Sequence, residues 1–600
     1  MEKIKEEYPD AVILDITSNS ETRYAKILSP FYPHGNIPIP FTDGLKATCV
    51  EAVWQGLKVF EGAGVDFATF KNDTMRDLKR TVRKYGIPKG HSKGAYSKEL
   101  LGYFEARMLI YLPTYKWVLD NVPEVHHVVE RIKKQSKIQD IVLLDYNTNI
   151  DFRDISKPMS HAGLVKLYIE GKYPDNMDDY KPMNKEEIEE KKIREKEFKK
   201  ELKKKAKETF LYALSALLLG IAIGAIDAVF GRVLLFITDF RSAHVVVLLP
   251  FLPLAGLGIV WLYRHFNETA AKGMTLVMEA GQGKRESIPL ALIPLVMAGT
   301  WITHLFGGSA GREGVAVQIG ATLSHAFARR FHFPDNGRIV LIAGMAAGFG
   351  GLFQTPFAAV FFAMEVVVSG SMAYSALLPA AIASFTASAT SHALGLEKFS
   401  VLLSQTLSLT DTKTVTYLIL FGILFGLTGR LFAVLLQKVK QFMGNVLENP
   451  YKRIGFVSIP LAVFLFLMWN GRYCGLGTNL IAQAFSGGEL YMFDWILKLL
   501  FTVLTLSIGF QGGEVTPLFS IGASLGFVLG SLTGLPPIVC AALGYAAVFG
   551  SATNTLLAPV LIGMEVFGVE NGLAFFAVCL VAFLVNGNRC IYTAQKRSFW

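Results

Sequence analysis

A succession of apolar stretches dominates this chain after Thr209. Several are shorter than the roughly 20 residues that a helix needs to cross a bilayer, and many are interrupted by glycine or proline. This pattern predicts a membrane protein of short, broken helices that meet near the midplane, and it disfavours a simple bundle of full-length spans. The stretches cover about 209–230, 243–262, 288–306, 315–328, 338–368, 372–394, 414–437, 454–470, 494–510, 515–532, 537–567 and 571–587.

Charge is concentrated in one segment ahead of these stretches. Charged residues make up only 18% of the chain, yet 19 of the 24 residues from Lys185 to Glu208 are charged, 11 basic and 8 acidic. Glutamates and lysines one helical turn apart predict a solvated helix that acts as a connector. The net charge of +10 therefore fits a basic flank at a membrane better than nucleic-acid binding.

The N-terminal part predicts a separate soluble domain of α+β structure. The runs Ala11–Leu14 and Ile141–Leu144 are typical of strands, and helical periodicity runs through Val50–Phe60 and Lys98–Asn121. We therefore divide the chain into three parts: a soluble domain (1–180), a charged helical linker (181–208) and a membrane domain (209–600).

The charge pattern also predicts the orientation in the membrane. The strongly basic stretch from Lys199 to Lys207 abuts the apolar run at Thr209, so the chain should enter the bilayer from the cytoplasm. Met1 to Lys5 opens without the apolar stretch of a signal peptide. We expect a multi-pass cell-membrane protein with a cytoplasmic N-terminal domain. The five cysteines lack CxxC spacing, so we expect no zinc or other metal site, no disulfide framework and no cofactor.

One carboxylate stands in a glycine-rich loop at membrane depth. The run from Gly307 to Gln318, GGSAGREGVAVQ, contains four glycines within eight residues and the acid Glu313. An ionisable group inside a membrane is costly and marks a functional site. Converging backbone N–H groups and the positive end of the following helix favour an anion there. Glu313 is itself an anion and would compete for that place.

The membrane part contains an internal repeat. Gly344–Val366 and Gly544–Val566 are identical at 11 of 23 positions, and a glycine–glutamate element precedes each of them at nearly the same offset. Transporters built from repeats place their sites where the halves meet, at the ends of broken helices. We therefore predict two related halves with the site between them.

These motifs resemble the CLC family of anion channels and proton-coupled anion antiporters. Gly311-Arg312-Glu313-Gly314 matches the family's GREG element, in which the glutamate is the gate. Gly513 to Pro517 lies where chloride members carry a GxFxP element, and Tyr592 lies where the family has its central tyrosine. The resemblance covers about 205–595. It implies a mainly α membrane protein with a CLC-type inverted-repeat helical bundle, Glu313 as its gating and proton-carrying residue, and a homodimer with one pathway in each subunit.

Several departures resemble the fluoride/proton antiporter branch, CLC-F. Met274 stands where chloride members have a serine, Val315 replaces the proline after GREG, and Glu514 adds a carboxylate to the second anion loop. The internal proton-transfer glutamate of chloride antiporters would fall at Val366, beside Glu365. That relay is missing here, which leaves the proton pathway open.

The chemistry of fluoride agrees with this assignment. Fluoride is small and tightly hydrated, so close, directional donors must replace its water. Backbone N–H groups at Gly311 to Val315 and Glu514 to Thr516, with the hydroxyls of Thr516 and Tyr592, are donors of this kind, and Met274 would narrow the path. The anion-binding candidates are Gly311, Arg312, Gly314, Val315, Met274, Glu514, Val515, Thr516 and Tyr592.

Most of these residues also have a purely structural interpretation. Glu514 could neutralise a helix dipole, Met274 could fill an apolar gap, and Tyr592 could anchor at the membrane interface. Arg312 could anchor the loop without touching the ion. We interpret two glutamates at equivalent helix ends of the repeat as structural, Glu365 and Glu565.

The sequence therefore predicts a fluoride/proton antiporter that expels cytoplasmic fluoride across the lipid bilayer. A passive anion channel and a chloride/proton antiporter remain the alternatives. For the N-terminal domain, Leu28 to Pro33 and Val50 to Lys58 resemble the LSNFYP and SVEHxFQAxK patterns of NADAR-type (YbiA-like) N-glycosidases. This resemblance implies Glu51 as an acidic catalyst; the alternative is a binding or regulatory module.

Overall fold

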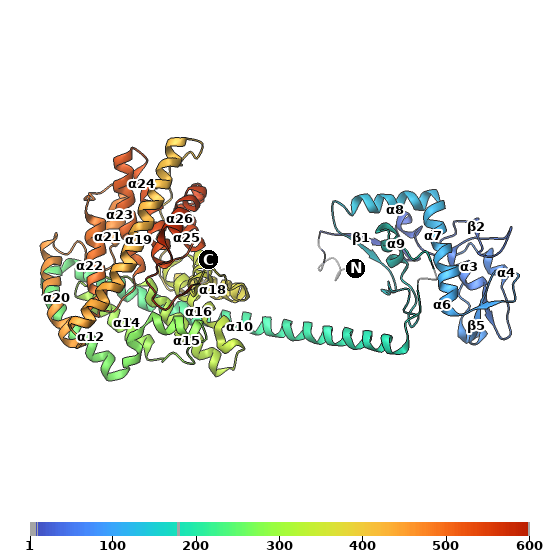
Figure 1. The fold of residues 1–600 in the computed structure, drawn as a ribbon, viewed down its shortest axis with the longest axis horizontal. Coiled ribbons are helices and arrows are strands. Elements are labelled where there is room, and N and C mark those ends of the chain that lie inside the picture. Colours follow the sequence, from blue (N-terminus) through green and yellow to red (C-terminus); the bar gives the residue numbers. More distant parts are fainter. Residues whose placement is uncertain (1–7, 9, 177–179, 598–600) are drawn as a thin grey trace. The chain divides into compact units, whose positions relative to one another are not determined.

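The computed structural model describes residue 8, residues 10–176 and residues 180–597. The chain forms two compact units, Met1–Lys203 and Lys204–Trp600, and each is described here by itself (Figure 1). Met1 to Lys5, on which the judgement about a signal peptide rests, lies outside the described residues.

The N-terminal unit has the predicted α+β composition. Strand β1 pairs in parallel with β7, with Val12 opposite Ile141. Strands β4, β5 and β6 form an antiparallel sheet, β2 pairs with β3, and apolar side chains gather into one core. The elements are β1 (Val12–Asp15), α2 (Arg23–Lys26), β2 (Ile37–Pro38), β3 (Lys46–Ala47), α3 (Val50–Gly56), β4 (Lys58–Phe60), α4 (Phe67–Phe70), α5 (Val82–Tyr85), β5 (Pro88–Ser92), β6 (Leu100–Leu101), α6 (Tyr103–Ala106), η1 (Arg107–Tyr111), α7 (Leu112–Asn121), α8 (Pro123–Gln135), β7 (Ile141–Leu144) and α9 (His161–Ile169).

Both strand predictions in this unit are confirmed within one residue, but the two helix predictions were too long. The first helix ends at Gly56, because Lys58 to Phe60 pairs with β5 as strand β4. The second begins only at Tyr103 and passes through a π-helical turn before α7. Pairing with a distant strand outweighs local periodicity, which is the general weakness of propensity-based prediction.

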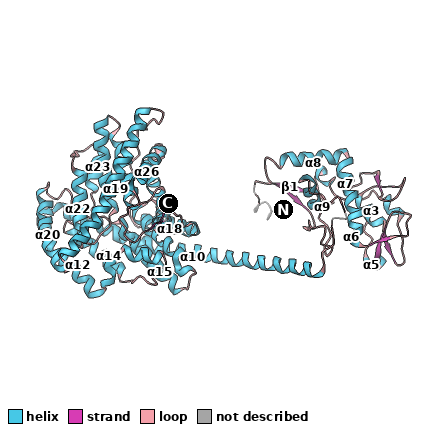
Figure 2. Cartoon of the chain, in the orientation of Figure 1, coloured by secondary structure: helices cyan, strands magenta, loops and turns pink. Residues whose placement is uncertain are grey.

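The membrane unit is almost entirely helical (Figure 2). Within the described residues, five helices are long and apolar enough to cross a membrane, and six apolar helices of 10–17 residues are shorter. This mixture confirms the predicted short and interrupted helices. The elements are α10 (Lys185–Ala243), α11 (Val245–Leu248), η2 (Leu249–Phe251), α12 (Leu252–Phe266), η3 (Glu268–Lys272), α13 (Met274–Gly281), α14 (Leu292–Leu305), α15 (Glu313–Arg330), η4 (Asp335–Gly337), α16 (Arg338–Phe353), α17 (Pro356–Val366), β8 (Val368–Ser369), η5 (Tyr374–Ala376), α18 (Leu377–Ala393), α19 (Thr412–Val446), α20 (Pro450–Leu467), α21 (Thr478–Ser486), α22 (Asp494–Ile508), α23 (Val515–Thr533), α24 (Pro537–Thr553), α25 (Leu557–Phe567), α26 (Gly572–Asn586) and β9 (Lys596–Arg597).

The charged run and the first apolar run form one helix. Helix α10 continues without a break from Lys185 to Ala243, whereas the sequence pattern predicted a connector followed by a separate membrane helix. Lysine, glutamate, alanine and leucine all favour helix, and no proline interrupts them, so nothing in the chain separates the two parts. The short helices α13 and α21 were not predicted, because each lies between longer apolar stretches.

Two of the long apolar stretches are each divided into two helices, in keeping with the predicted interruptions. The 338–368 stretch breaks after α16 and the 537–567 stretch breaks after α24. Gln354 and Asn554 adopt left-handed backbone conformations, with φ of 60° and 57°, and each ends its helix. The breaks fall at equivalent points of the repeat, so the two halves share this feature.

The helices of both halves cross through glycines. A Cβ on Gly320 of α15 would lie 2.0 Å from the carbonyl oxygen of Gly344 in α16, and one on Gly522 of α23 would lie 2.1 Å from that of Gly544 in α24. Any side chain at these positions would push the helices apart. The two halves are therefore built on the same close-packed helix pair, which confirms the repeat.

Candidate functional site

The two glycine–glutamate loops are joined directly by their backbones. The N–H of Gly311 donates to the carbonyl oxygen of Gly513 at 2.5 Å, and the N–H of Gly513 donates to that of Gly311 at 2.8 Å. This antiparallel bridge lies just before α15 and α23. The N-termini of both helices therefore converge on one place, and their positive ends with them.

Glu313, the first residue of α15, is fully buried at this junction. Its carboxylate accepts a short hydrogen bond from the hydroxyl of Thr516, at the start of α23 in the other half. The side-chain Nε of Arg312 lies 3.4 Å from the other carboxylate oxygen. The predicted gate and one predicted anion ligand are thus in contact across the two halves.

Glu514 lies against the same junction from the opposite loop. A Cβ on Gly314 would lie 3.4 Å from a carboxylate oxygen of Glu514, so the two loops lie in close contact here. Val515 and Val315 are fully buried beside them. Four of the predicted positions, Gly314, Val315, Glu514 and Val515, therefore lie close around Glu313.

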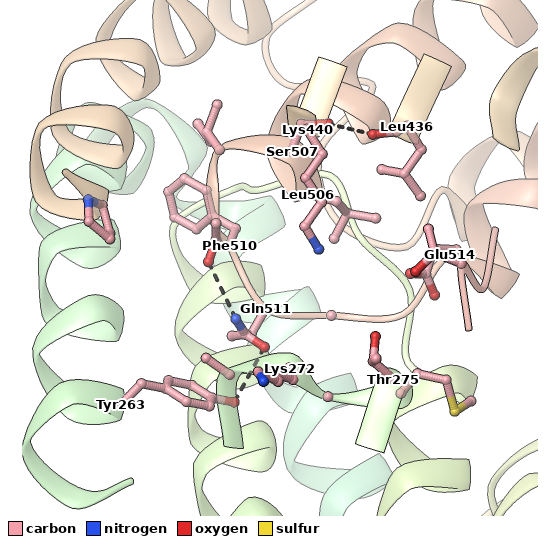
Figure 3. Close-up of a pocket in the computed structure, with 18 of the residues that line it drawn as sticks. Tyr263, Lys272, Thr275, Leu436, Lys440, Leu506, Ser507, Phe510, Gln511 and Glu514 are labelled. Carbon is pink, nitrogen blue, oxygen red and sulfur yellow. Dashed lines mark hydrogen bonds between the residues drawn. The ribbon is translucent and has the colours of Figure 1, made fainter. Parts of the chain in front are cut away.

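A cavity of about 630 Å³ opens beside Glu514. Figure 3 shows Glu514 and Thr275 entering it from different segments, with Tyr263 and Gln511 hydrogen-bonded at its wall. Met274 and Tyr592 also line this cavity, which we call the vestibule, whereas Glu313 does not line it. Four basic and two acidic side chains line it, which favours an anion: Arg264, Lys272, Lys440, Arg453, Glu268 and Glu514.

Most polar residues of the vestibule were not among the predicted candidates, and two of them come from the segments that carry Glu313 and Met274. Gln318 follows Glu313 by more than one turn of α15, lines the cavity, and has a buried side-chain oxygen without a partner among the described residues. Thr275, beside Met274, lines it as well. Gln318 lies five residues after Glu313, which is not the three- or four-residue spacing of one helix face, and Lys440 comes from the distant α19, so neither residue leaves a local signal.

Three of the backbone donors expected for an anion are engaged within the protein, and one of them, the N–H of Arg312, donates to the carboxylate of Glu313 at 3.4 Å. Gly311 donates to Gly513, as described above, and the N–H of Val315 donates to the carbonyl oxygen of Arg312 at 3.0 Å. Gly311 therefore joins the two halves in this conformation. The hydroxyl of Tyr592 is buried and has no hydrogen-bond partner among the described residues. A donor reserved for an anion would have this property.

In chemical terms, the junction holds a carboxylate where two positive helix ends, a hydroxyl and a guanidinium converge. These groups would bind a small anion equally well. The carboxylate of Glu313 and a small anion would therefore compete for the same donors at this junction.

In the N-terminal unit, the predicted acid Glu51 is also buried. Glu51 in α3 is 7% exposed and accepts a hydrogen bond from the side-chain amide of Gln55 at 2.8 Å. Trp54 of the same helix stacks on His91 at 3.8 Å between ring centroids and contacts Tyr111 edge-on at 5.5 Å. An acid beside a cluster of aromatic rings is a candidate acid–base or ligand site.

Burial governs the titration of these groups. It raises the pKa of the Glu51 carboxyl, although Gln55 and nearby lysines oppose the shift. Burial lowers the pKa of His91 to about 3, and the charge of Lys58 acts in the same direction. Both groups are thus shifted towards their neutral forms in the folded unit.

The helices break at the same points in both halves, and the two loops meet at the buried carboxylate of Glu313. These features define a membrane ion transporter of the inverted-repeat class. The family model described as voltage gated chloride channel matches residues 255–587. The chain belongs to this family, the CLC family. Residues 1–165 match a family of unknown function, DUF6939.

Individual relatives refine this placement. A protein of Pseudomonas syringae pv. tomato named chloride/fluoride channel protein is 35% identical over 386 residues, which is 63% of this chain and 85% of that protein. The voltage-gated ClC-type chloride channel ClcB of Salmonella typhimurium is 24% identical over 346 residues, 55% of this chain and 81% of that protein.

Two solved structures share the fold. The crystal structure of a CLC-type fluoride/proton antiporter is 49% identical, with a TM-score of 0.64, and the match covers 65% of this chain and 98% of the other. A slow cyanobacterial Cl⁻/H⁺ antiporter is 20% identical, with a TM-score of 0.56, covering 64% and 96%. The second match is evidence for the fold alone.

Proposed function

We propose that this chain is a fluoride/proton antiporter that exports cytoplasmic fluoride. The observation that carries the proposal is the buried carboxylate of Glu313, bound to the hydroxyl of Thr516 at the meeting point of two helix N-termini. A carboxylate in an anion's place exchanges with the anion when it takes up a proton. The 49% identity to a CLC-type fluoride/proton antiporter supports fluoride as the substrate.

The residues around Glu313 have distinct roles in this proposal. Thr516 and the helix starts at Gly314 and Val515 hold either the carboxylate or the anion. Glu514 and Tyr592 line the vestibule side, where they receive the proton or the ion. Arg312 orients Glu313, because its Nε lies 3.4 Å from the carboxylate. Val366 cannot carry a proton, so the route must use other groups.

We further propose that the vestibule faces the cytoplasm of a cell-membrane protein that functions as a homodimer. Lys272, Lys440 and Arg453 line it, and basic residues favour the cytoplasmic side. The basic stretch from Lys199 to Lys207 supports a cytoplasmic N-terminal domain by the same rule. The three-part division of the chain at 180 and 208 belongs to this proposal.

Ion flux into proteoliposomes tests the function. Purified protein is reconstituted with equal fluoride on both sides, a pH gradient is imposed, and external fluoride is followed with a selective electrode. An antiporter moves fluoride against its own gradient until the proton gradient is spent. No fluoride movement from this starting point, together with equilibration of a separately imposed fluoride gradient, would indicate a passive channel. Accumulation of chloride but not fluoride would indicate a chloride/proton antiporter.

For the N-terminal domain we propose a binding or regulatory role, with N-glycosidase activity as the second candidate. The buried Glu51 beside Trp54 and Tyr111 favours the enzyme, because cleavage of an N-glycosidic bond through an oxocarbenium-like state needs a nearby carboxylate. Incubation of the domain with ribosylated bases or ADP-ribose adducts tests this, with Glu51→Gln as the control. Equal turnover by both, or none, leaves the binding role.

A further inference from the structure

A buried lysine lies behind the loop that leads to Glu313. Lys498 in α22 is fully buried. Its Nζ donates to the hydroxyl of Ser309 at 2.9 Å and to the carbonyl oxygens of Tyr473 at 3.1 Å and Gly475 at 2.7 Å. An ammonium group has three N–H donors, so each of them has an acceptor here.

The charge of this lysine is not neutralised by the nearest acid of its own helix. Asp494, one turn earlier in α22, pairs with Arg472 at 2.7 Å and accepts from the Tyr473 hydroxyl at 2.6 Å. The acceptors around Lys498 are instead neutral oxygens, two from the backbone and one from a hydroxyl. Such a set of oxygens is what a small hard cation prefers in proteins.

The loop around the ammonium group is shaped to fit it. Gly475 and Gly477 have φ of 63° and 85°, which residues with side chains rarely adopt. A Cβ on Gly477 would lie 2.8 Å from the Cε of Lys498. The backbone can therefore wrap closely around the side chain, and its carbonyl groups can turn towards the nitrogen.

The same oxygens organise the segment that precedes Glu313. The carbonyl oxygen of Gly475 also accepts from the N–H of Ala310 at 3.2 Å, and the N–H of Gly475 donates to Gly308 at 3.0 Å. Ser309 is held in addition by Thr502 at 2.9 Å. Lys498 thus sits at the centre of the contacts that fix Gly308 to Ala310, directly before the bridge at Gly311.

The feature belongs to one half of the repeat only. Counted back equally from the paired glycines Gly513 and Gly311, Lys498 corresponds to Val296, a buried residue of α14. The duplicated fold therefore forms around an apolar side chain at this position. The charged version lies beside the loop that carries Glu313, which points to a role specific to that loop.

We propose that Lys498 is a tethered cation: its ammonium group fills a built-in monovalent-cation site whose oxygens hold the Glu313 loop in place. It acts as a positioning residue for the gate and does not touch the transported ion. This role rests on the proposed antiport function. The cation site itself, however, can be tested without measuring transport.

Three variants separate a cation site from a simple packing position. Lys498→Ala removes the ammonium and leaves the oxygens with space for a free cation. Lys498→Met fills that space with an apolar chain of similar length. Val296→Ala is the matched control, because it shortens the equivalent side chain in the other half. All are compared with the unchanged full chain in sodium, potassium, ammonium, methylammonium or N-methylglucamine gluconate at equal ionic strength.

Thermal unfolding in detergent gives the first result, and it does not depend on transport. One of the small cations should raise the melting temperature of Lys498→Ala by at least ~3 °C over N-methylglucamine, because a ligand that binds only the folded state stabilises it. Lys498→Met and Val296→Ala should show no such dependence. An Ala variant indifferent to all four small cations, or a Met variant as stable as the unchanged protein, would overturn the proposal.

Fluoride flux in liposomes gives the second result. Lys498→Met should lose at least ~10-fold in rate while remaining folded, and the cation that stabilises Lys498→Ala should restore its rate at least ~5-fold. Full activity of the Met variant would show that the charge is dispensable. If the unchanged protein itself moves no fluoride, the proposed function fails, and the thermal data alone decide the role of Lys498.

Discussion

Glu365 and Glu565 each bind the N-terminus of the helix that carries the other. Glu365, near the end of α17, accepts from the backbone N–H groups of Leu556, Leu557 and Ala558 at 2.6 to 3.4 Å. Glu565, near the end of α25, accepts from two N–H groups at the start of α17 at 3.1 and 2.8 Å. The two helices therefore run antiparallel, and the carboxylates satisfy donors that a helix start leaves free.

This reciprocal pair predicts a graded loss of stability. Glu365→Ala leaves three donors without their acceptor, and Glu565→Ala leaves two, so each should destabilise the protein by about 1–3 kcal/mol, with the larger effect at Glu365. Melting temperatures in detergent provide the measurement. Glu365→Gln retains one oxygen acceptor and should fall between Glu365→Ala and the unchanged protein. An Ala variant that melts with the unchanged protein would show that the contacts contribute nothing.

Glu313→Gln should abolish proton-driven fluoride accumulation. The amide has the shape of a protonated carboxyl and can still accept from Thr516, but it can neither release a proton nor compete as an anion. Uptake in proteoliposomes under a pH gradient should fall to the level of empty vesicles. Glu279→Gln serves as the control, because Glu279 forms an ion pair with Arg285 away from the loop junction. Uphill transport by the Glu313 variant would contradict the mechanism.

Met274→Ser should raise chloride flux relative to fluoride. Met274 lines the vestibule at the start of α13, and serine there adds a hydroxyl donor and removes bulk, which eases entry of the larger ion. We expect a severalfold increase in the chloride-to-fluoride ratio, measured by paired electrode assays. Met345→Ser, at a buried methionine of α16 that does not line the vestibule, controls for loss of packing. An unchanged ratio would remove Met274 from the selectivity path.

The local sequence pattern predicted most of the helices and the meeting of the two glycine–glutamate loops. It could not predict the contacts between the two halves. Glycine spacing and a lone acid identified Glu313, because both are visible within a few residues. The hydrogen bond from Thr516 and the neutral cage around Lys498 join segments about 200 residues apart, and no local signal encodes them. Helix α16 ends just before Gln354, where the backbone adopts a left-handed conformation. A hydropathy profile does not show such a conformation, so it cannot locate the break.

The N-terminal domain should lose stability as the pH falls from 7 to 5. Burial lowers the pKa of His34 to about 4 and that of His91 to about 3, whereas both protonate near 6.5 when unfolded. The unfolded chain therefore binds more protons below pH 6.5, and stability falls with pH by about 1–2 kcal/mol per histidine at pH 5. The raised pKa of Glu51 acts in the opposite direction.

A comparison of the unchanged domain with a His91 variant isolates the contribution of His91 to the loss of stability. Urea unfolding of the domain, followed by tryptophan fluorescence at pH 7 and 5, is compared with His91→Phe, which keeps an aromatic ring against Trp54. The variant should lose less stability between the two pH values. Parallel losses in both proteins would show that folding does not shift the pKa of His91.

A shortened chain that begins at Lys199 should still insert and transport fluoride. The N-terminal unit has its own apolar core, and the ion pairs that join it to the start of α10 lie ahead of the cut. They are Arg153 with Glu187 at 3.3 Å and Lys191 with Asp154 at 3.3 Å. Truncation therefore leaves no partner of these pairs in the membrane unit, and it preserves the basic flank that sets orientation.

The transport rate of the shortened chain should lie within about twofold of the full-length rate, because residues 209–600 already contain both loops and the vestibule. Fluoride efflux from proteoliposomes at equal protein content provides the measurement. The control begins at Thr209 and lacks the lysines from 199 to 207. It should insert with mixed orientation, seen as partial protection from added protease. A Lys199 chain that is monodisperse yet inactive would make the N-terminal domain an obligate part of the gate.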